Sequence, residues 1–178
     1  FCIDHHVNHK EYATYNWTDS SATSTCEILF RLFRQNGYPI TKEVAEALFT
    51  GLSFDTGGFR HSSMTPEIFR MAADLSDTGI DITAIMNGLF HTKGFVETKV
   101  LGVILQKAYL YRDQIVVSAM ETRDFQAVGA TSDDSEGAVA TLAEVSEAEV
   151  AVFLRELAPN TIRVNMRSKH RVDVAAVA

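Results

Sequence analysis

The chain has 178 residues, 46% of them hydrophobic and 22% charged, and a net charge of −7. This length predicts one domain or two small ones, and the acidic balance argues against a protein that coats long duplex nucleic acid through a basic surface. No apolar run approaches the roughly 20 residues of a membrane crossing, so we expect no membrane partner. The chain contains two cysteines, Cys2 and Cys26, which favours reduced thiols and a cytoplasmic location.

The first part of the sequence predicts a strand end followed by helices. Phe1 to Ile3 have the apolar β-type character of a buried strand, and Asp4-His5-His6 follows at its tip. Apolar residues at helical spacing then predict helices at about 20–37, 41–54, 65–79, 81–89 and 95–107. Ser24 with Glu27 has the spacing of a capping box.

The pattern changes near residue 108. The stretches 109–111 and 115–120 predict a hairpin, short helices are expected near 122–128 and 133–143, and two strands at 149–157 and 161–168. In the last strand, three apolar residues alternate with three polar or basic ones, so we expect the apolar face to be buried. The apolar residues are Ile162, Val164 and Met166, and the polar or basic residues are Arg163, Asn165 and Arg167.

Four segments are candidates for chemistry. Asp4-His5-His6 offers imidazoles that a neighbouring carboxylate can orient, and Asp55-Thr56-Gly57-Gly58 places a carboxylate before glycines that let a phosphate approach the backbone. The hydroxyl-rich run 20–25 can bind an anion at a helix start, and 163–169 carries arginines suited to phosphate. For each segment a structural interpretation stays open: a surface turn, a helix end, N-capping and a solvated strand face. His9, His61, His91 and His170 are isolated, which favours a surface or structural role.

Taken together, these motifs resemble the DHH phosphoesterases. Ile3-Asp4-His5-His6, then 21–28, then Leu52-Ser53-Phe54-Asp55-Thr56-Gly57-Gly58-Phe59-Arg60 follow in the order of that family. Phe153-Leu154-Arg155-Glu156 and 164–169 look like its accessory DHHA1 domain. The closest similarity is to the branch of bifunctional oligoribonucleases and 3′-phosphoadenosine 5′-phosphate phosphatases.

The resemblance implies an α/β fold in which residues 1–92 form the C-terminal half of a DHH domain with a parallel sheet. Residues 93–108 are then a helical linker, and 109–178 an α+β DHHA1 domain. It also implies two Mn²⁺ ions, with His5 and Asp55 as metal ligands, and His6 as a catalytic residue at the scissile phosphate that Asp4 orients. Arg167, Ser168 and Lys169 would bind the substrate, a short RNA or a nucleotide, from across the cleft between the domains.

The implied function is two-metal hydrolysis of phosphoester bonds. Alternatives are an inorganic pyrophosphatase or exopolyphosphatase, a cyclic-dinucleotide phosphodiesterase, and an inactive nucleotide-binding module. The family's aspartate-bearing motifs before Asp-His-His and its GGGH motif after DHHA1 do not occur in the sequence, so we expect a fragment that is inactive by itself. The sequence leaves the oligomeric state open, with a homodimer as one option.

Overall fold

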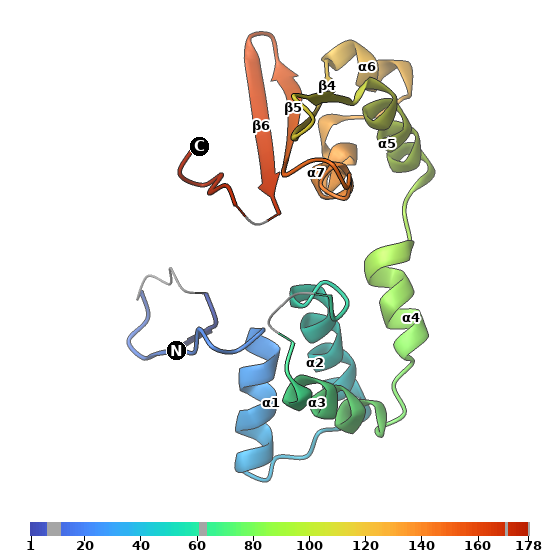
Figure 1. Cartoon of the computed structure of the whole chain (residues 1–178). Helices are drawn as coiled ribbons and strands as arrows, with labels where there is room; N and C mark the ends of the chain where they lie inside the picture. Colours follow the sequence, from blue (N-terminus) through green and yellow to red (C-terminus); the bar gives the residue numbers. More distant parts are fainter. Residues whose placement is uncertain (7–11, 61–63, 170, 178) are drawn as a thin grey trace. The chain divides into compact units, whose positions relative to one another are not determined.

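The computed structural model describes residues 1–6, 12–60, 64–169 and 171–177. The chain divides into two compact units, residues 1–92 and 93–178, which are described separately (Figure 1). Strands and helices occur in both units, which confirms the predicted α/β class. Within the described ranges, no helix combines the length and apolar character that spanning a membrane requires.

A short parallel strand pair opens the first unit. β1 (Cys2–Asp4) lies beside β2 (Asn16–Thr18), with Cys2 opposite Asn16 and Asp4 opposite Thr18. β1 agrees with the predicted strand before the histidines. We predicted no element at β2, because three residues are too short to show an alternating pattern.

The other regular elements described in the first unit are helices, and α1, α2 and α3 pack around a core that includes Leu52, Ile68 and Leu75. The predicted N-cap of α1 is present, since Ser24 Oγ accepts a hydrogen bond of 3.1 Å from the Glu27 N–H. The helices are α1 (Thr25–Gln35), α2 (Lys42–Asp55), α3 (Pro66–Ser76) and α4 (Ile82–Met86), which continues into the π-helical turn η1 (Asn87–His91).

The helices α1 and α2 cross closely. A Cβ atom at Gly51 would lie 2.3 Å from the Cys26 sulfur, closer than side chains tolerate. A larger residue at position 51 therefore requires the Cys26 side chain or the helices to shift. The crossing matters because it fixes the end of α2, where Asp55 lies, relative to α1.

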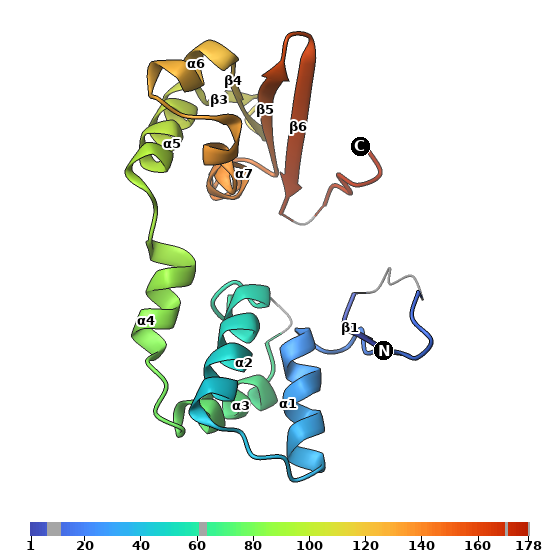
Figure 2. The same cartoon turned by 180° about the vertical axis from the view of Figure 1, so that it is seen from behind.

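The second unit is a four-stranded sheet with helices on one face, as Figure 2 shows from behind. The strand order is β3-β4-β5-β6, and β4 and β5 are parallel while the outer pairs are antiparallel. The strands are β3 (Tyr109–Tyr111), β4 (Ile115–Met120), β5 (Val150–Ala158) and β6 (Thr161–Ser168). The helical elements are α5 (Phe95–Lys107), α6 (Thr122–Ala127), η2 (Ser132–Ser135) and α7 (Ala138–Leu142).

The helix expected as a linker, 93–108, lies within the second unit. Its residues Val100 and Ile104 are fully buried and share a core with Val116, Leu142 and Phe153. The boundary between the units falls after residue 92 and not near 108, because the apolar stripe of α5 packs on the sheet. The helix expected at 133–143 is divided into η2 and α7 by Gly137, which has a φ of +78°.

The faces of β6 are the reverse of our prediction. Arg163 lies opposite Arg155 and Asn165 opposite Phe153, and both β5 residues are buried against the helices. The basic face of β6 therefore turns to the helical side. Ile162 and Val164, which we expected to be buried, are 60% and 48% exposed. The prediction fails because β6 is an edge strand, and the helices cover only its polar side.

Candidate functional site

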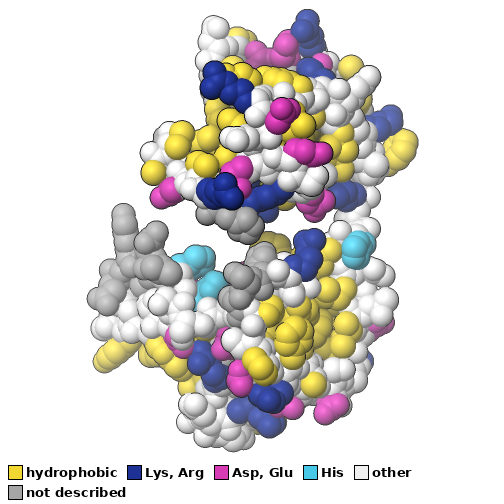
Figure 3. Space-filling model, viewed as in Figure 1, with side chains coloured by type: hydrophobic (Ala, Val, Ile, Leu, Met, Phe, Trp, Pro, Cys, Tyr) yellow, Lys and Arg dark blue, Asp and Glu magenta, His cyan; other side chains and the backbone are white. Residues whose placement is uncertain are grey.

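Asp4 holds the two histidines that follow β1. Its Oδ1 accepts hydrogen bonds from the backbone N–H groups of His5 (2.7 Å) and His6 (3.1 Å), and His6 Nδ1 lies 2.7 Å from the same oxygen. The His6 side chain is 73% exposed, and histidine side chains reach the surface in Figure 3. A carboxylate on one ring nitrogen fixes the orientation of an imidazole. The His6 ring is therefore oriented by Asp4, with Nε2 left for a ligand.

His5 faces the last residue of α2. Its Nε2 lies 3.6 Å from Asp55 Oδ2, and the two side chains are 19% and 34% exposed. This separation is long for a hydrogen bond. It suits two ligands of one metal ion, because metal–ligand bonds of about 2.0–2.2 Å place neighbouring donors roughly 3–4 Å apart. His5 and Asp55 can therefore hold one ion between them.

The described residues do not gather a complete set of metal ligands. No group of three or more His, Cys, Asp or Glu side chains suited to a metal occurs among residues 1–6, 12–60, 64–169 and 171–177. His9, His61 and His170 lie outside the described residues, and His91 ends η1 with an exposed side chain. The structure thus brings together two of the predicted ligands, His5 and Asp55, beside the predicted catalytic pair Asp4 and His6.

The loop after Asp55 turns the chain but offers no phosphate cradle. Gly57, Gly58 and Phe59 all have positive φ values, of 59°, 69° and 64°, a conformation that glycine adopts without strain. The backbone N–H groups of residues 57–60 all donate within the chain, to Phe54 O, Ser53 O, Thr56 Oγ1 and Thr56 O. The backbone N–H groups of residues 57–60 are therefore not free to donate to a phosphate, contrary to our expectation for these glycines.

The start of α1 is likewise occupied by the protein's own carboxylates. Glu27 Oε2 accepts from the Thr23 N–H (2.7 Å) and hydroxyl (2.9 Å), and Asp19 accepts from the Ser21 N–H at 3.1 Å. Hydrogen bonds from the Ser21 hydroxyl and from Arg31 lower the pKa of Asp19 against the opposing effect of burial. Two carboxylates at this end favour the capping interpretation over an anion site.

Cys26 lies close to the candidate site, which the motif spacing did not indicate. Burial raises the pKa of its thiol, and the charge of the nearby Asp55 carboxylate raises it further. The sulfur lies at the crossing of α1 and α2, where it faces Gly51.

The predicted substrate-binding residues at the end of β6 differ in their surroundings. Arg167 lies opposite the buried Ala151, on the helical side, while Ser168 points to the other face. Lys169 Nζ donates to the carbonyls of Val145 (2.5 Å) and Ser146 (3.2 Å). Arg167 is exposed and has no ion pair or side-chain hydrogen bond among the described residues. Of the two charged residues, Arg167 and Lys169, Arg167 is the one whose charge is available to a ligand.

Comparison with known proteins finds similarity to DHH proteins. Residues 1–52 match the model of the DHH family, N-terminal domain. The chain is 29% identical over 170 residues to the bifunctional oligoribonuclease and PAP phosphatase NrnA of Bacillus subtilis, a match that covers 94% of this chain and 54% of the relative. The protein of the same name from Thermus thermophilus is 28% identical over 177 residues, with 99% and 52% covered.

A solved structure shares the fold. The crystal structure of an exopolyphosphatase-related protein from Bacteroides fragilis has a TM-score of 0.86 and 28% identity, and the match covers 94% of this chain and 50% of that chain. The chain thus spans about half the length of the relatives it matches. These similarities confirm the resemblance to the DHH family and its bifunctional branch that the motifs predicted.

Proposed function

We propose that this chain is part of a DHH-type, metal-dependent phosphoesterase that hydrolyses short oligoribonucleotides, 3′-phosphoadenosine 5′-phosphate, or both. The observation that carries the proposal is the pair of donors His5 Nε2 and Asp55 Oδ2, 3.6 Å apart beside the anchored His6. The relatives named as bifunctional oligoribonucleases and PAP phosphatases support the substrate class.

His5 and Asp55 are proposed to hold a Mn²⁺ ion, since carboxylate oxygens suit Mn²⁺ and histidine is the commonest side-chain metal ligand. When bound there, the ion would supply a positive charge that polarises a phosphoryl oxygen. Asp4 holds the His6 ring by Nδ1, and His6 Nε2 then contacts an oxygen of the scissile phosphate. A polar contact in that position would stabilise negative charge as it develops during hydrolysis.

Arg167 is proposed to bind a terminal phosphate of the nucleotide. Its guanidinium can make two parallel hydrogen bonds to phosphate oxygens, and no carboxylate of the described chain neutralises it. Ser168 points to the opposite face of the sheet, and the Lys169 ammonium is held by two carbonyls. We therefore assign the substrate contact at this strand end to Arg167 alone.

A second candidate function is hydrolysis of polyphosphate. It is favoured by the fold similarity to the exopolyphosphatase-related protein of Bacteroides fragilis. The two functions differ in whether a nucleoside is required, so a polyphosphate substrate beside a dinucleotide separates them.

The test is a hydrolysis assay of the complete protein with Mn²⁺, before and after chelation. We expect turnover of a 5′-phosphorylated diadenylate and of 3′-phosphoadenosine 5′-phosphate that chelator abolishes and Mn²⁺ restores. Asp55→Asn should lower turnover by at least about 100-fold, because even outer-shell partners of metal ligands contribute 10- to 100-fold. Asp74→Asn, which removes an exposed carboxylate of α3, is the matched control. Turnover that withstands chelation or Asp55→Asn would contradict the proposal.

A further inference from the structure

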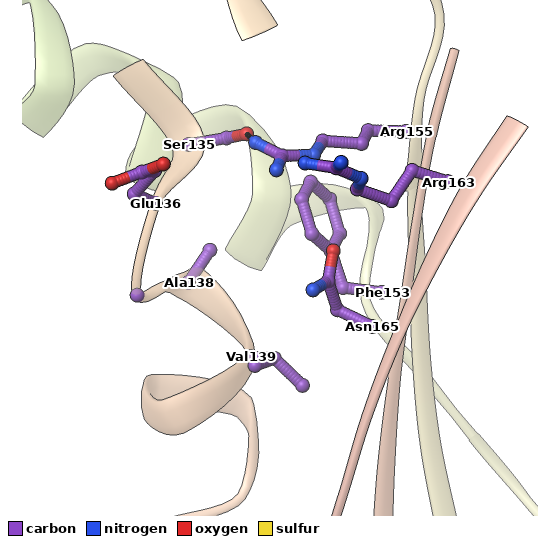
Figure 4. Close-up of a pocket in the computed structure, with 9 residues that line it drawn as sticks. Ser135, Glu136, Ala138, Val139, Phe153, Arg155, Arg163 and Asn165 are labelled. Carbon is purple, nitrogen blue, oxygen red and sulfur yellow. Dashed lines mark hydrogen bonds between the residues drawn. The ribbon is translucent and has the colours of Figure 1, made fainter. Parts of the chain in front are cut away.

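A pocket of about 310 Å³ lies in the second unit, between the middle of β5 and β6 and the segment that joins η2 to α7. This volume is at the lower end of the range for small-molecule sites. Figure 4 shows Arg155 and Arg163 running side by side from the two strands toward Ser135. Phe153 and Asn165 line the same wall, and Glu136 lies opposite. None of these residues belongs to the proposed catalytic site.

Arg155 is a buried cation whose hydrogen bonds are incomplete. The whole residue is only 6% exposed. Nη1 donates to Ser132 O (2.7 Å) and Ser135 Oγ (3.1 Å), whereas the buried Nε has no hydrogen-bond partner in the described structure. A buried charge without a counter-charge is costly, and neither Ser132 nor Ser135 supplies one.

Arg163 adds a second positive charge beside the first. It lies directly opposite Arg155 in the β5–β6 register, and like charges in that position repel. Neither guanidinium has a carboxylate within 4 Å among the described residues, although Glu136 lines the pocket. Two adjacent guanidiniums in a chain of net charge −7 create a local field that attracts an anion.

We propose that this pocket binds a phosphate-bearing small anion between Arg155 and Arg163. The fork of each guanidinium matches phosphate oxygens. Ser135 and Asn165 offer further polar groups around the same space. The shared chemistry is an oxyanion of the phosphate type, either free or carried by a mononucleotide. The inference concerns the second unit only and goes beyond the proposed function, because it needs neither the His5–Asp55 pair nor turnover.

The test is calorimetric titration of the complete protein with inorganic phosphate, and separately with adenosine 5′-monophosphate, in the presence of EDTA. Chelation removes any metal at His5 and Asp55, so binding there does not contribute. We expect Arg163→Gln to weaken phosphate binding about 10- to 150-fold, the range for a lost charge-assisted contact. Arg123→Gln is the matched control, because Arg123 is an exposed arginine of the same unit that pairs with Glu121. It should bind like the parent protein.

Two further variants locate the anion. Glu136→Gln should tighten phosphate binding, because it removes the carboxylate that faces the two arginines. Arg167→Gln distinguishes the pocket from the strand end proposed for substrate. Phosphate binding that withstands Arg163→Gln but is lost in Arg167→Gln would overturn the inference and leave the proposed function intact. Equal affinity for phosphate and the mononucleotide indicates a site for the phosphate alone, and tighter binding of the mononucleotide indicates a nucleotide site.

Discussion

The two units of the molecule each bring a pair of polar side chains together, but the pairs have opposite character. In the first unit, His5 and Asp55 face each other at 3.6 Å across the tips of β1 and α2. In the second unit, Arg155 and Arg163 stand opposite each other on neighbouring strands. An imidazole and a carboxylate are metal ligands, whereas two guanidiniums are anion ligands. The difference predicts that the first pair is completed by a cation and the second by an oxyanion.

The pairs also differ in what holds them in place. His5 follows a three-residue strand, and Asp55 is the last residue of its helix, so both positions depend on how the surrounding segments pack. Arg155 and Arg163 are fixed by the backbone hydrogen bonds of a long antiparallel strand pair. We therefore expect changes in helix packing to disturb the positions of His5 and Asp55 more than those of Arg155 and Arg163.

The largest effects are expected from substitutions of His5 and His6, which should differ in their effect on metal content. In the complete protein, His6→Ala should lower turnover of a dinucleotide at least about 100-fold, within the range for a lost contact to developing charge. Bound Mn²⁺ should stay near the parent level, because His6 is held by Asp4 and not by the metal. His5→Ala should lower metal content and turnover together.

The measurements are metal analysis by atomic emission and steady-state kinetics on both variants. Asp4→Asn serves as an intermediate case, since it keeps the size of the side chain that orients His6 and removes its charge. Loss of metal in His6→Ala with full metal in His5→Ala would reverse our assignment of the two rings.

The next largest effect is expected from substitution of Arg167, with Lys169 in the same unit as the comparison. Arg167→Ala should slow hydrolysis of a dinucleotide by about 10- to 150-fold, corresponding to a charge-assisted contact of about 1.5–3 kcal/mol. Hydrolysis of an aryl phosphodiester without a second phosphate should change little. Lys169→Ala should instead lower the free energy of unfolding, because its ammonium holds the carbonyls of Val145 and Ser146.

The assay measures kcat/KM on both substrates, with denaturant unfolding of each variant as the second readout. Equal losses on the two substrates in Arg167→Ala would show that Arg167 does not recognise the nucleotide phosphate. A loss of dinucleotide activity in a fully stable Lys169→Ala protein would assign that contact to the lysine instead.

The smallest effect tests the packing that positions Asp55. Gly51→Ala should lower the free energy of unfolding by about 1–2 kcal/mol, because overpacking costs about 1–3 kcal/mol and the gain in helix propensity offsets up to about 1 kcal/mol. In a Cys26→Ala background the sulfur is gone, and the Cβ at position 51 would meet Cys26 Cβ at an ordinary 3.5 Å. There the same change should be neutral or stabilising, as urea unfolding would show.

The sequence predicted local features well. The helix start at Ser24 depends on neighbouring residues, and its N-cap occurs where expected. The structure also brings His5 and Asp55 of the predicted motifs within 3.6 Å of each other, while their roles stay predictions. Features set by partners distant in the sequence were missed: the short strand β2, the crossing of Cys26 with Gly51, and the register that places Arg163 beside Arg155. The exposed apolar face of β6 was mispredicted because alternation reveals two faces but not which one the helices cover.

The most direct test of the central claim is the number of Mn²⁺ ions bound by the complete protein and by two aspartate variants. Calorimetric titration of the parent protein, Asp55→Asn and Asp74→Asn gives this number. We predict that Asp74→Asn binds as the parent does, and that Asp55→Asn loses at least one ion or binds it at least about 100-fold more weakly. Unchanged stoichiometry and affinity in Asp55→Asn would contradict the assignment of His5 and Asp55 as ligands of one ion.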